Sequence, residues 1–175
     1  MTDIRVVGTI EEARSEICNL PRPLGLVPTM GGLHAGHLAL VQRASSESES
    51  VVVTVFVNPM QFGADEDYDT YPRDVGADVA ELGSKDVDLI FAPSVSEMYP
   101  SGFDTYVDIG RLAKYLEGEE RPLHFRGVAT IVCKLFAIVR PDRAYFGQKD
   151  VQQSLIVKRL NTDLNLGADI IIVPT

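Results

Sequence analysis

The chain has 175 residues, 45% of them hydrophobic and 23% charged, as in an ordinary globular protein. This length supplies one substantial core, so we expect a single domain over residues 1–175. The formal net charge of −9 argues against general nucleic-acid binding, because phosphate backbones require clustered lysine and arginine. Since no apolar run approaches the roughly 20 residues of a membrane helix and the first residues lack a secretory pattern, a cytoplasmic protein is expected.

Short β-rich runs alternate with helical patterns along the chain. The expected strands are Leu24–Val27, Val51–Val57, Val87–Ala92, Arg143–Phe146 and Asp169–Val173, and the expected helices are Thr9–Cys18, Gly36–Ser48, Arg73–Leu82, Gly127–Val139 and Val151–Asn161. Thr9 and Glu12 have the spacing of a capping box at the start of the first helix. The alternation predicts an α/β fold with a doubly wound, Rossmann-like parallel sheet.

Two segments interrupt this alternation. Residues 63–71 lack a period, and we expect a mobile flap there. Their acidic side chains indicate a solvated loop rather than a metal site; they are Asp65, Glu66, Asp67 and Asp69. Residues 93–118 are irregular, with a candidate short strand at Thr105–Ile109 and a helical turn at Arg111–Leu116.

The cysteines and the chain end support two further expectations. Cys18 and Cys133 fall in apolar helical patterns without a CxxC spacing, which predicts buried thiols in a reducing compartment, although a disulfide between them stays open. The strand-like run 170–173 is followed by only two residues. Because ligands in such sheets bind beyond the carboxyl ends of strands, we expect a piece of a longer protein.

Residues 28–37 read Pro-Thr-Met-Gly-Gly-Leu-His-Ala-Gly-His and lie between an expected strand and an expected helix. Gly31 and Gly32 allow a sharp turn. His34 and His37 are spaced to project from one side of a first helical turn. A helix N-terminus carries unpaired N–H groups that suit phosphate, and two imidazoles add donors, so the motif indicates nucleotide chemistry.

Two alternatives compete with this interpretation. The histidine spacing occurs by chance in many chains. A zinc site is the other alternative, but the remaining histidine is His124 and the two cysteines are far apart in the sequence.

Three further segments hold polar side chains near expected strand or helix ends. Asn58 and Gln61 follow the central strand, where they line a pocket rim or simply form a turn. Gly147 and Lys149 follow a second strand, and Lys149 supplies a charge suited to phosphate. Either Gln152 or Gln153 faces back to the pocket, while His124 and Arg126 contact substrate or only begin a helix.

Together these segments resemble the pantothenate synthetase (pantoate–β-alanine ligase) family. The matching stretches follow the family's order and are Val27–His37, Val55–Phe62, Tyr71–Arg73, His124–Val128, Val139–Asp142 and Tyr145–Asp150. The resemblance implies the His-x-Gly-His nucleotidyltransferase type of Rossmann-like fold. The family continues into a loop with a Met-Ser-Ser-Arg motif and a smaller lid domain, which we expect to be absent.

The resemblance also implies roles for individual residues. ATP would be held by Met30, Gly31, Gly32, Leu33, His34, Ala35, Gly36 and His37, and by a second segment of Gly147, Gln148, Lys149 and Asp150. The implied catalytic groups are His37 (the family's proton donor), His34 and Lys149. Gln61, Gln153 and Asn58 would contact pantoate, with Gln61 also contacting β-alanine, and Tyr71 and His124 are further pocket residues. Many members have glutamate at the position of Gln148.

The implied activity is an ATP-dependent condensation of pantoate with β-alanine through a pantoyl-adenylate, which releases pyrophosphate and AMP in coenzyme A biosynthesis. Mg²⁺ would screen the triphosphate, no protein metal ligands are predicted, and a homodimer is expected. Without the lid we expect impaired turnover. Two other functions remain open: a nucleotidyltransferase of the same superfamily, and a non-catalytic nucleotide-binding or dimerisation fragment.

Overall fold

The computed structural model describes residues 4–83 and 86–174, where six parallel strands form one sheet. The strands are β1 (Arg5–Val7), β2 (Leu24–Thr29), β3 (Ser50–Val55), β4 (Leu89–Phe91), β5 (Arg143–Gly147) and β6 (Asp169–Val173), in the spatial order β1-β4-β3-β2-β5-β6. From β2 the chain first builds β3 and β4 on one side and later β5 and β6 on the other. The predicted doubly wound sheet is confirmed, and its direction of winding reverses between β2 and β5.

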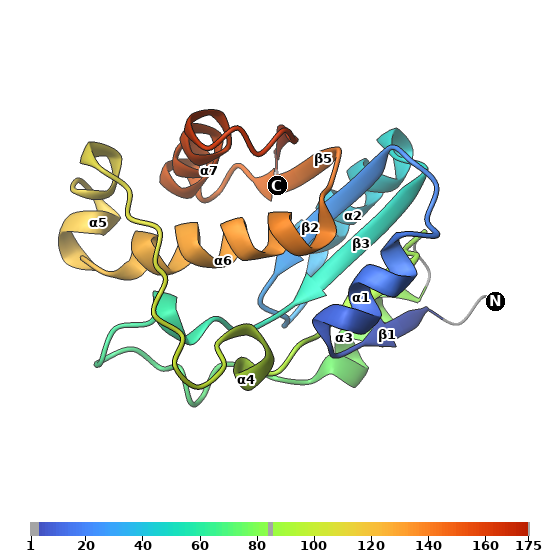
Figure 1. The fold of residues 1–175 in the computed structure, drawn as a ribbon, viewed down its shortest axis with the longest axis horizontal. Helices are drawn as coiled ribbons and strands as arrows, with labels where there is room; N and C mark the ends of the chain where they lie inside the picture. Colours follow the sequence, from blue (N-terminus) through green and yellow to red (C-terminus); the bar gives the residue numbers. More distant parts are fainter. Residues whose placement is uncertain (1–3, 84–85, 175) are drawn as a thin grey trace.

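Helices cover both faces of the sheet. They are α1 (Ile10–Ile17), α2 (Ala35–Glu47), α3 (Val75–Leu82), α4 (Val95–Met98), α5 (Glu117–Glu120), α6 (His124–Val139) and α7 (Val151–Asp163), with 3₁₀ turns η1 (Pro59–Gln61) and η2 (Arg111–Ala113). One core joins the sheet to α1, α6 and α7, and a second joins it to α2 and α3. Figure 1 shows α6 crossing one face of the sheet with α2 behind it.

Local sequence explains several element boundaries. The predicted capping box is present, because Thr9 Oγ1 accepts from Glu12 N at 3.2 Å and the Glu12 carboxylate accepts from Thr9 N at 3.0 Å. The run of β3 is buried on both faces, with Val52 in the first core and Val53 in the second. This two-sided burial accounts for its continuous apolar sequence.

Other predictions were wrong or incomplete. No strand forms at Thr105–Ile109, because the N–H of Val107 donates to Thr130 Oγ1 (3.0 Å) on α6 instead of to a neighbouring strand. The turn expected at Arg111–Leu116 is limited to η2. β1 was not predicted, since three residues with two exposed side chains leave no periodic signal.

The cysteines are also placed differently from expectation. Cys18 is exposed, because it caps the end of α1 rather than lying on its buried face. Cys133 is half-buried on α6, and both thiols are free. Among the described residues, no helix is long and apolar enough to cross a bilayer.

Candidate functional site

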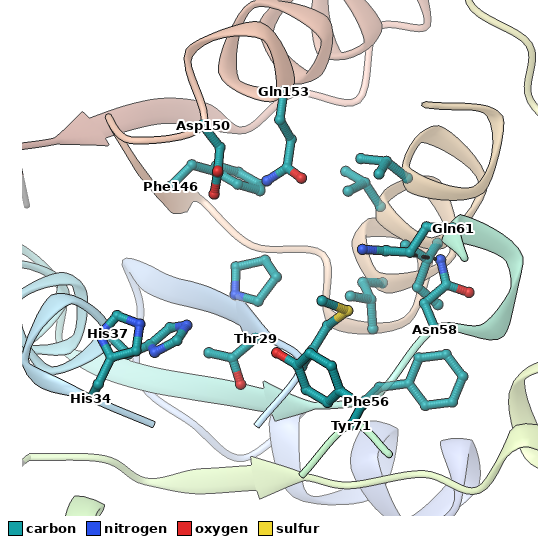
Figure 2. Close-up of a pocket in the computed structure, with 16 residues that line it drawn as sticks. Thr29, His34, His37, Phe56, Asn58, Gln61, Tyr71, Phe146, Asp150 and Gln153 are labelled. Atoms are coloured by element: carbon teal, nitrogen blue, oxygen red, sulfur yellow. Dashed lines mark hydrogen bonds between the residues drawn. The ribbon is translucent and has the colours of Figure 1, made fainter. Parts of the chain in front are cut away.

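A cavity of about 270 Å³ lies at the carboxyl ends of β2, β3 and β5. This is the point where the winding of the sheet reverses, the usual ligand crevice of such folds. Its lining combines residues from four parts of the chain: Pro28, Thr29, Met30, His34 and His37; Phe56, Asn58, Gln61 and Tyr71; Val128, Ile131, Val132 and Leu135; and Phe146, Asp150 and Gln153. Figure 2 shows the two imidazoles at one end of the cavity and the amides of Asn58 and Gln61 at the other.

The imidazole end is built at the start of α2. The rings of His34 and His37 lie 4.2 Å apart between centroids, as their spacing predicted. His34 is the N-cap, and its Nδ1 accepts from Gly36 N at 3.0 Å. The neutral ring therefore carries its proton on Nε2, which leaves that nitrogen as a donor.

His37 lines the cavity beside His34. Its Nδ1 is buried and has no hydrogen-bond partner within residues 4–83 and 86–174. Burial, together with the nearby His34, lowers the pKa of His37, while Asp78 and Asp150 partly oppose that shift. A neutral ring at pH 7 that gains a proton when negative charge arrives can follow charge developing on a ligand.

The glycine turn before α2 presents fewer free amides than the motif suggested. Gly31 and Gly32 have φ of +82° and +63°, a left-handed conformation that favours glycine. The N–H of Gly31 donates to Thr29 Oγ1 (3.2 Å), and the N–H groups of Gly32 and Leu33 donate to Asp78. The N–H groups in the first turn of α2 have no helical carbonyl to bind, and that of Gly36 donates instead to His34 Nδ1.

At the opposite end, Asn58 holds Gln61. Asn58 is 1% exposed, and its Nδ2 donates to Gln61 Oε1 and Gly127 O, both at 3.1 Å. Its Oδ1 accepts from Tyr99 Oη at 2.8 Å and from Met60 N at 3.3 Å. Because these bonds use the full hydrogen-bonding capacity of Asn58, the Nε2 of Gln61 is the group positioned to meet a ligand.

The start of α6 supports this end from behind. A Cβ on Gly127 would lie 2.3 Å from Met60 O, so only glycine lets α6 approach η1 this closely. His124 is buried, does not line the cavity, and its Nδ1 lies 2.9 Å from Gln61 O. The structure thus places His124, predicted as a pocket residue, in a supporting position, where burial lowers its pKa.

Helix α7 closes the cavity from the side of β5. Asp150 and Gln153 point into it (Figure 2), whereas Gln152 turns away and donates to Leu112 O (3.0 Å) and Tyr115 O (2.6 Å). The structure therefore resolves the open choice between the two glutamines. Lys149 is exposed and outside the lining, but its charge contributes to lowering the pKa of His37, after burial and His34.

The remaining predicted ATP residues surround the cavity rather than line it. Gly31, Gly32, Leu33, Ala35, Gly36, Gly147 and Gln148 lie in the two segments that carry Met30, His34, His37 and Asp150 into the wall. Tyr71 does line the cavity, and burial raises the pKa of its phenol. Its ring meets Phe62 edge to face at 5.8 Å between centroids, which fastens the predicted flap to the site.

The acidic flap does not gather its carboxylates. Glu66 forms an ion pair with Arg121 and accepts from Gly63 N at 2.8 Å. No group of three or more potential metal-binding side chains occurs in the part of the chain that the structure describes.

Sequence reasoning missed two parts of the site. The apolar wall from α6 (Val128, Ile131, Val132 and Leu135) was not predicted as part of the site, because helical periodicity does not distinguish a core from a cavity wall. Asp78 was not selected at all. The sequence feature that could have indicated it is an acidic residue on the apolar side of the short helix α3.

Comparisons with known proteins agree on one family. The family model described as Pantoate-beta-alanine ligase matches residues 5–175. Curated relatives named pantothenate synthetase include one from Roseiflexus sp. (strain RS-1), 57% identical over 171 residues, and one from Chloroflexus aurantiacus, 59% identical over 172 residues. Each match covers 98% of this chain, but only 62% and 61% of the respective relatives.

Solved structures give the same result. Pantothenate synthetase from Thermus thermophilus superposes with a TM-score of 0.94 at 53% identity, covering 98% of this chain and 62% of that chain. A pantoate-beta-alanine ligase from Francisella tularensis, complexed with beta-gamma ATP and beta-alanine, has a TM-score of 0.94 at 40% identity, with 98% and 67% covered. The chain therefore spans less than two thirds of the length of the curated relatives named above.

Proposed function

Because this chain belongs to the pantoate-beta-alanine ligase family, we propose that it binds ATP and pantoate and serves the ATP-dependent ligation of pantoate to β-alanine. A pantoate carboxylate oxygen attacks the α-phosphorus of ATP, and the bond to the pyrophosphate oxygen breaks. The amine of β-alanine then attacks the acyl carbon of the pantoyl-adenylate, which releases AMP and forms pantothenate. The observation that carries the proposal is a single cavity with two imidazoles at one end and ligand-facing amides at the other.

The phosphates of ATP belong at the imidazole end. The imidazole of His37, the Nε2 of His34 and the first turn of α2 supply donors there. Lys149, on the exposed loop after β5, adds a mobile charge near His37. These three side chains stabilise charge growing on the α-phosphate, and His37 in its protonated form gives a proton to the pyrophosphate oxygen as its bond to phosphorus breaks. The segments Met30–His37 and Gly147–Asp150 hold the rest of the nucleotide.

Pantoate belongs at the amide end. Its two methyl groups suit the apolar wall of α6, while its hydroxyl and carboxylate oxygens suit donors from Gln61 and Gln153. Gln61 also orients β-alanine. Asn58 acts by holding Gln61, since its own polar atoms are engaged within the protein.

Magnesium fits the imidazole end. Of the described lining residues, Asp150 is the acidic one, and its carboxylate makes no capping bond to α7. One carboxylate together with substrate phosphates is a common way for proteins to hold Mg²⁺, which would screen the triphosphate.

A paired experiment tests this assignment. Pantoate-dependent exchange of pyrophosphate into ATP is expected for the wild-type chain. Gln153→Ala should weaken pantoate binding measured by calorimetry, whereas Gln152→Ala, whose side chain faces away, should not. Exchange driven by nicotinamide mononucleotide or phosphopantetheine would instead support a nucleotidyltransferase. If calorimetry detects no heat with ATP and none with pantoate, the result would support a non-catalytic fragment.

Further proposals rest on the family alone. We propose a homodimer in the cytoplasm, for which sedimentation and localisation are the tests, and a single domain over residues 1–175. We also propose that residues 1–175 by themselves form pantothenate more slowly than a whole relative, because they correspond to 62% of such a relative and an acyl-adenylate hydrolyses unless water is excluded. Equal rates would contradict that proposal.

A further inference from the structure

A buried carboxylate stands directly behind the glycine turn. Asp78 lies on α3, is 4% exposed, and has the core residue Leu82 one turn further along the same helix. Its Oδ1 accepts from Leu33 N at 2.8 Å and its Oδ2 from Gly32 N at 3.2 Å. Burying a charge is costly unless hydrogen bonds compensate it, so these two amides and this carboxylate stabilise one another.

The Gly31–Leu33 turn packs closely against the Asp78 carboxylate. A Cβ on Gly31 would lie 2.8 Å from Asp78 Oδ2 and 3.1 Å from Val55 Cγ1. Glycine is therefore required at this position both by its left-handed backbone and by the closeness of Asp78. Leu33, whose amide binds Asp78, is followed directly by His34, the N-cap of α2, and then by Ala35, the first residue of that helix.

We propose that Asp78 is a positioning residue of the nucleotide site, which fixes the Gly31–Leu33 turn and through it the imidazoles of His34 and His37. Asp78 does not line the site cavity; it lines a neighbouring cavity of about 240 Å³ that shares Met30 and Phe56 with the site cavity. It therefore acts through the backbone rather than on a ligand. The identity of that ligand as ATP rests on the proposed function.

Asp78 also acts on His37 through its charge. Burial and the neighbouring His34 lower the pKa of His37, and Lys149 adds to that shift. Asp78 and Asp150 oppose it. A general loss of stability would not change the titration of His37 in the folded chain, so this titration tests whether the charge of Asp78 reaches His37, and exchange at the bonded amides tests positioning.

The principal test is Asp78→Asn. The variant keeps the shape but turns one acceptor into an NH₂ group that faces a backbone N–H, and it removes the charge. We expect faster hydrogen exchange at the amides of Gly32 and Leu33, and a lower pKa of His37 by NMR. ATP affinity should fall by about tenfold or more, the usual effect of losing a hydrogen bond to a charged group.

The controls lie in the same chain. Asp74→Asn changes the N-cap of α3, where asparagine caps as well as aspartate, so exchange, titration and affinity should keep wild-type values. The chain has three histidines, and the His124 resonance should be unaffected by Asp78→Asn. Asp78→Glu keeps the charge while displacing the oxygens, so it should disturb the turn with a smaller change in the pKa of His37.

The outcomes are separable. A folded Asp78→Asn chain with wild-type exchange, His37 titration and ATP affinity would overturn the proposal. If that variant does not fold, Gly31→Ala attacks the same contact from the turn, and wild-type ATP affinity in this variant would be equally decisive. If the wild-type chain does not bind ATP, the proposed function fails, whereas the exchange and titration measurements still judge Asp78.

Discussion

At one end of the cavity His37 keeps a ring nitrogen without a partner among the described residues, whereas at the other end both side-chain polar atoms of Asn58 are engaged. The imidazole end can thus change its protonation when a charged ligand arrives. The amide end has no comparable freedom, because the packing of α6 against η1 and the bonds of Asn58 hold Gln61 in place.

This contrast suits two different demands. Charge that grows during a reaction is best met by groups whose protonation can follow it. A small neutral or singly charged substrate is best selected by donors in fixed positions. Mutations at the two ends should therefore affect different quantities: ATP binding and the rate at the imidazole end, and pantoate affinity with stability at the amide end.

The largest expected effect is that of His37→Gln on the rate. Glutamine keeps a donor but cannot take up a proton, so pantoate-dependent pyrophosphate exchange should slow by about 10²–10³-fold, as for other lost preorganised donors. Pantoate affinity by calorimetry should stay at its wild-type value. A large loss of pantoate affinity instead would break the proposed division between the two ends.

Gly127→Ala should produce the next largest effect, at the amide end. The new Cβ would lie within 2.6 Å of backbone atoms of Met60 and Gln61, which have no flexible side chain to yield. Overpacking of this kind costs about 1–3 kcal/mol, so urea unfolding should shift and pantoate binding should weaken with it.

Gly110→Ala is the matched control for that variant. The space around Gly110 is open within 4 Å, so the same substitution there should leave pantoate affinity unchanged. If Gly127→Ala were as harmless as Gly110→Ala, the amide end would not depend on close packing of α6.

Features encoded in neighbouring residues were predictable from the sequence. The capping box of α1, the turn at Gly31 and Gly32, and the pairing of His34 with His37 all depend on residues a few positions apart. The alternation of strands and helices likewise indicated a parallel sheet, and with it the edge at which the cavity lies.

Features that depend on distant partners were not predictable. Asp78 binds amides 45 and 46 positions away, and His124 contacts a carbonyl 63 positions away, so the local sequence does not reveal their partners. The residues around Val107 were wrongly predicted as a strand. Their sequence is strand-like, but the N–H of Val107 donates to Thr130 on α6 rather than to another strand. Long-range hydrogen bonds decided all three cases.

A moderate effect of pH on stability is expected from a histidine at each end of the cavity. Burial holds the pKa of His37 and of His124 below the ordinary 6.5, so each ring binds fewer protons when folded than when unfolded. Their contribution to the free energy of unfolding is complete above 6.5 and declines as the pH falls through 6.5 toward the folded value.

ATP should distinguish the two histidines. Its phosphates should raise the pKa of His37 and leave that of His124 unchanged, which NMR titration of the two rings with and without ATP measures. An equal response of both rings, or none at His37, would count against phosphate binding at the imidazole end.

The smallest effect is expected for Glu66→Gln, which breaks the ion pair between the flap and Arg121. Their side chains are 28% and 33% exposed, and such pairs contribute roughly 0–1 kcal/mol to stability. Arg121 also donates to Gln61 O at 3.3 Å, so a slight loss of pantoate affinity should accompany the change.

Asp163→Asn is the control. It breaks an exposed pair with Arg159 on α7 and should leave pantoate affinity unchanged. If Glu66→Gln weakened pantoate binding as much as Gly127→Ala, then charge on the flap, rather than packing of α6, would be what positions Gln61.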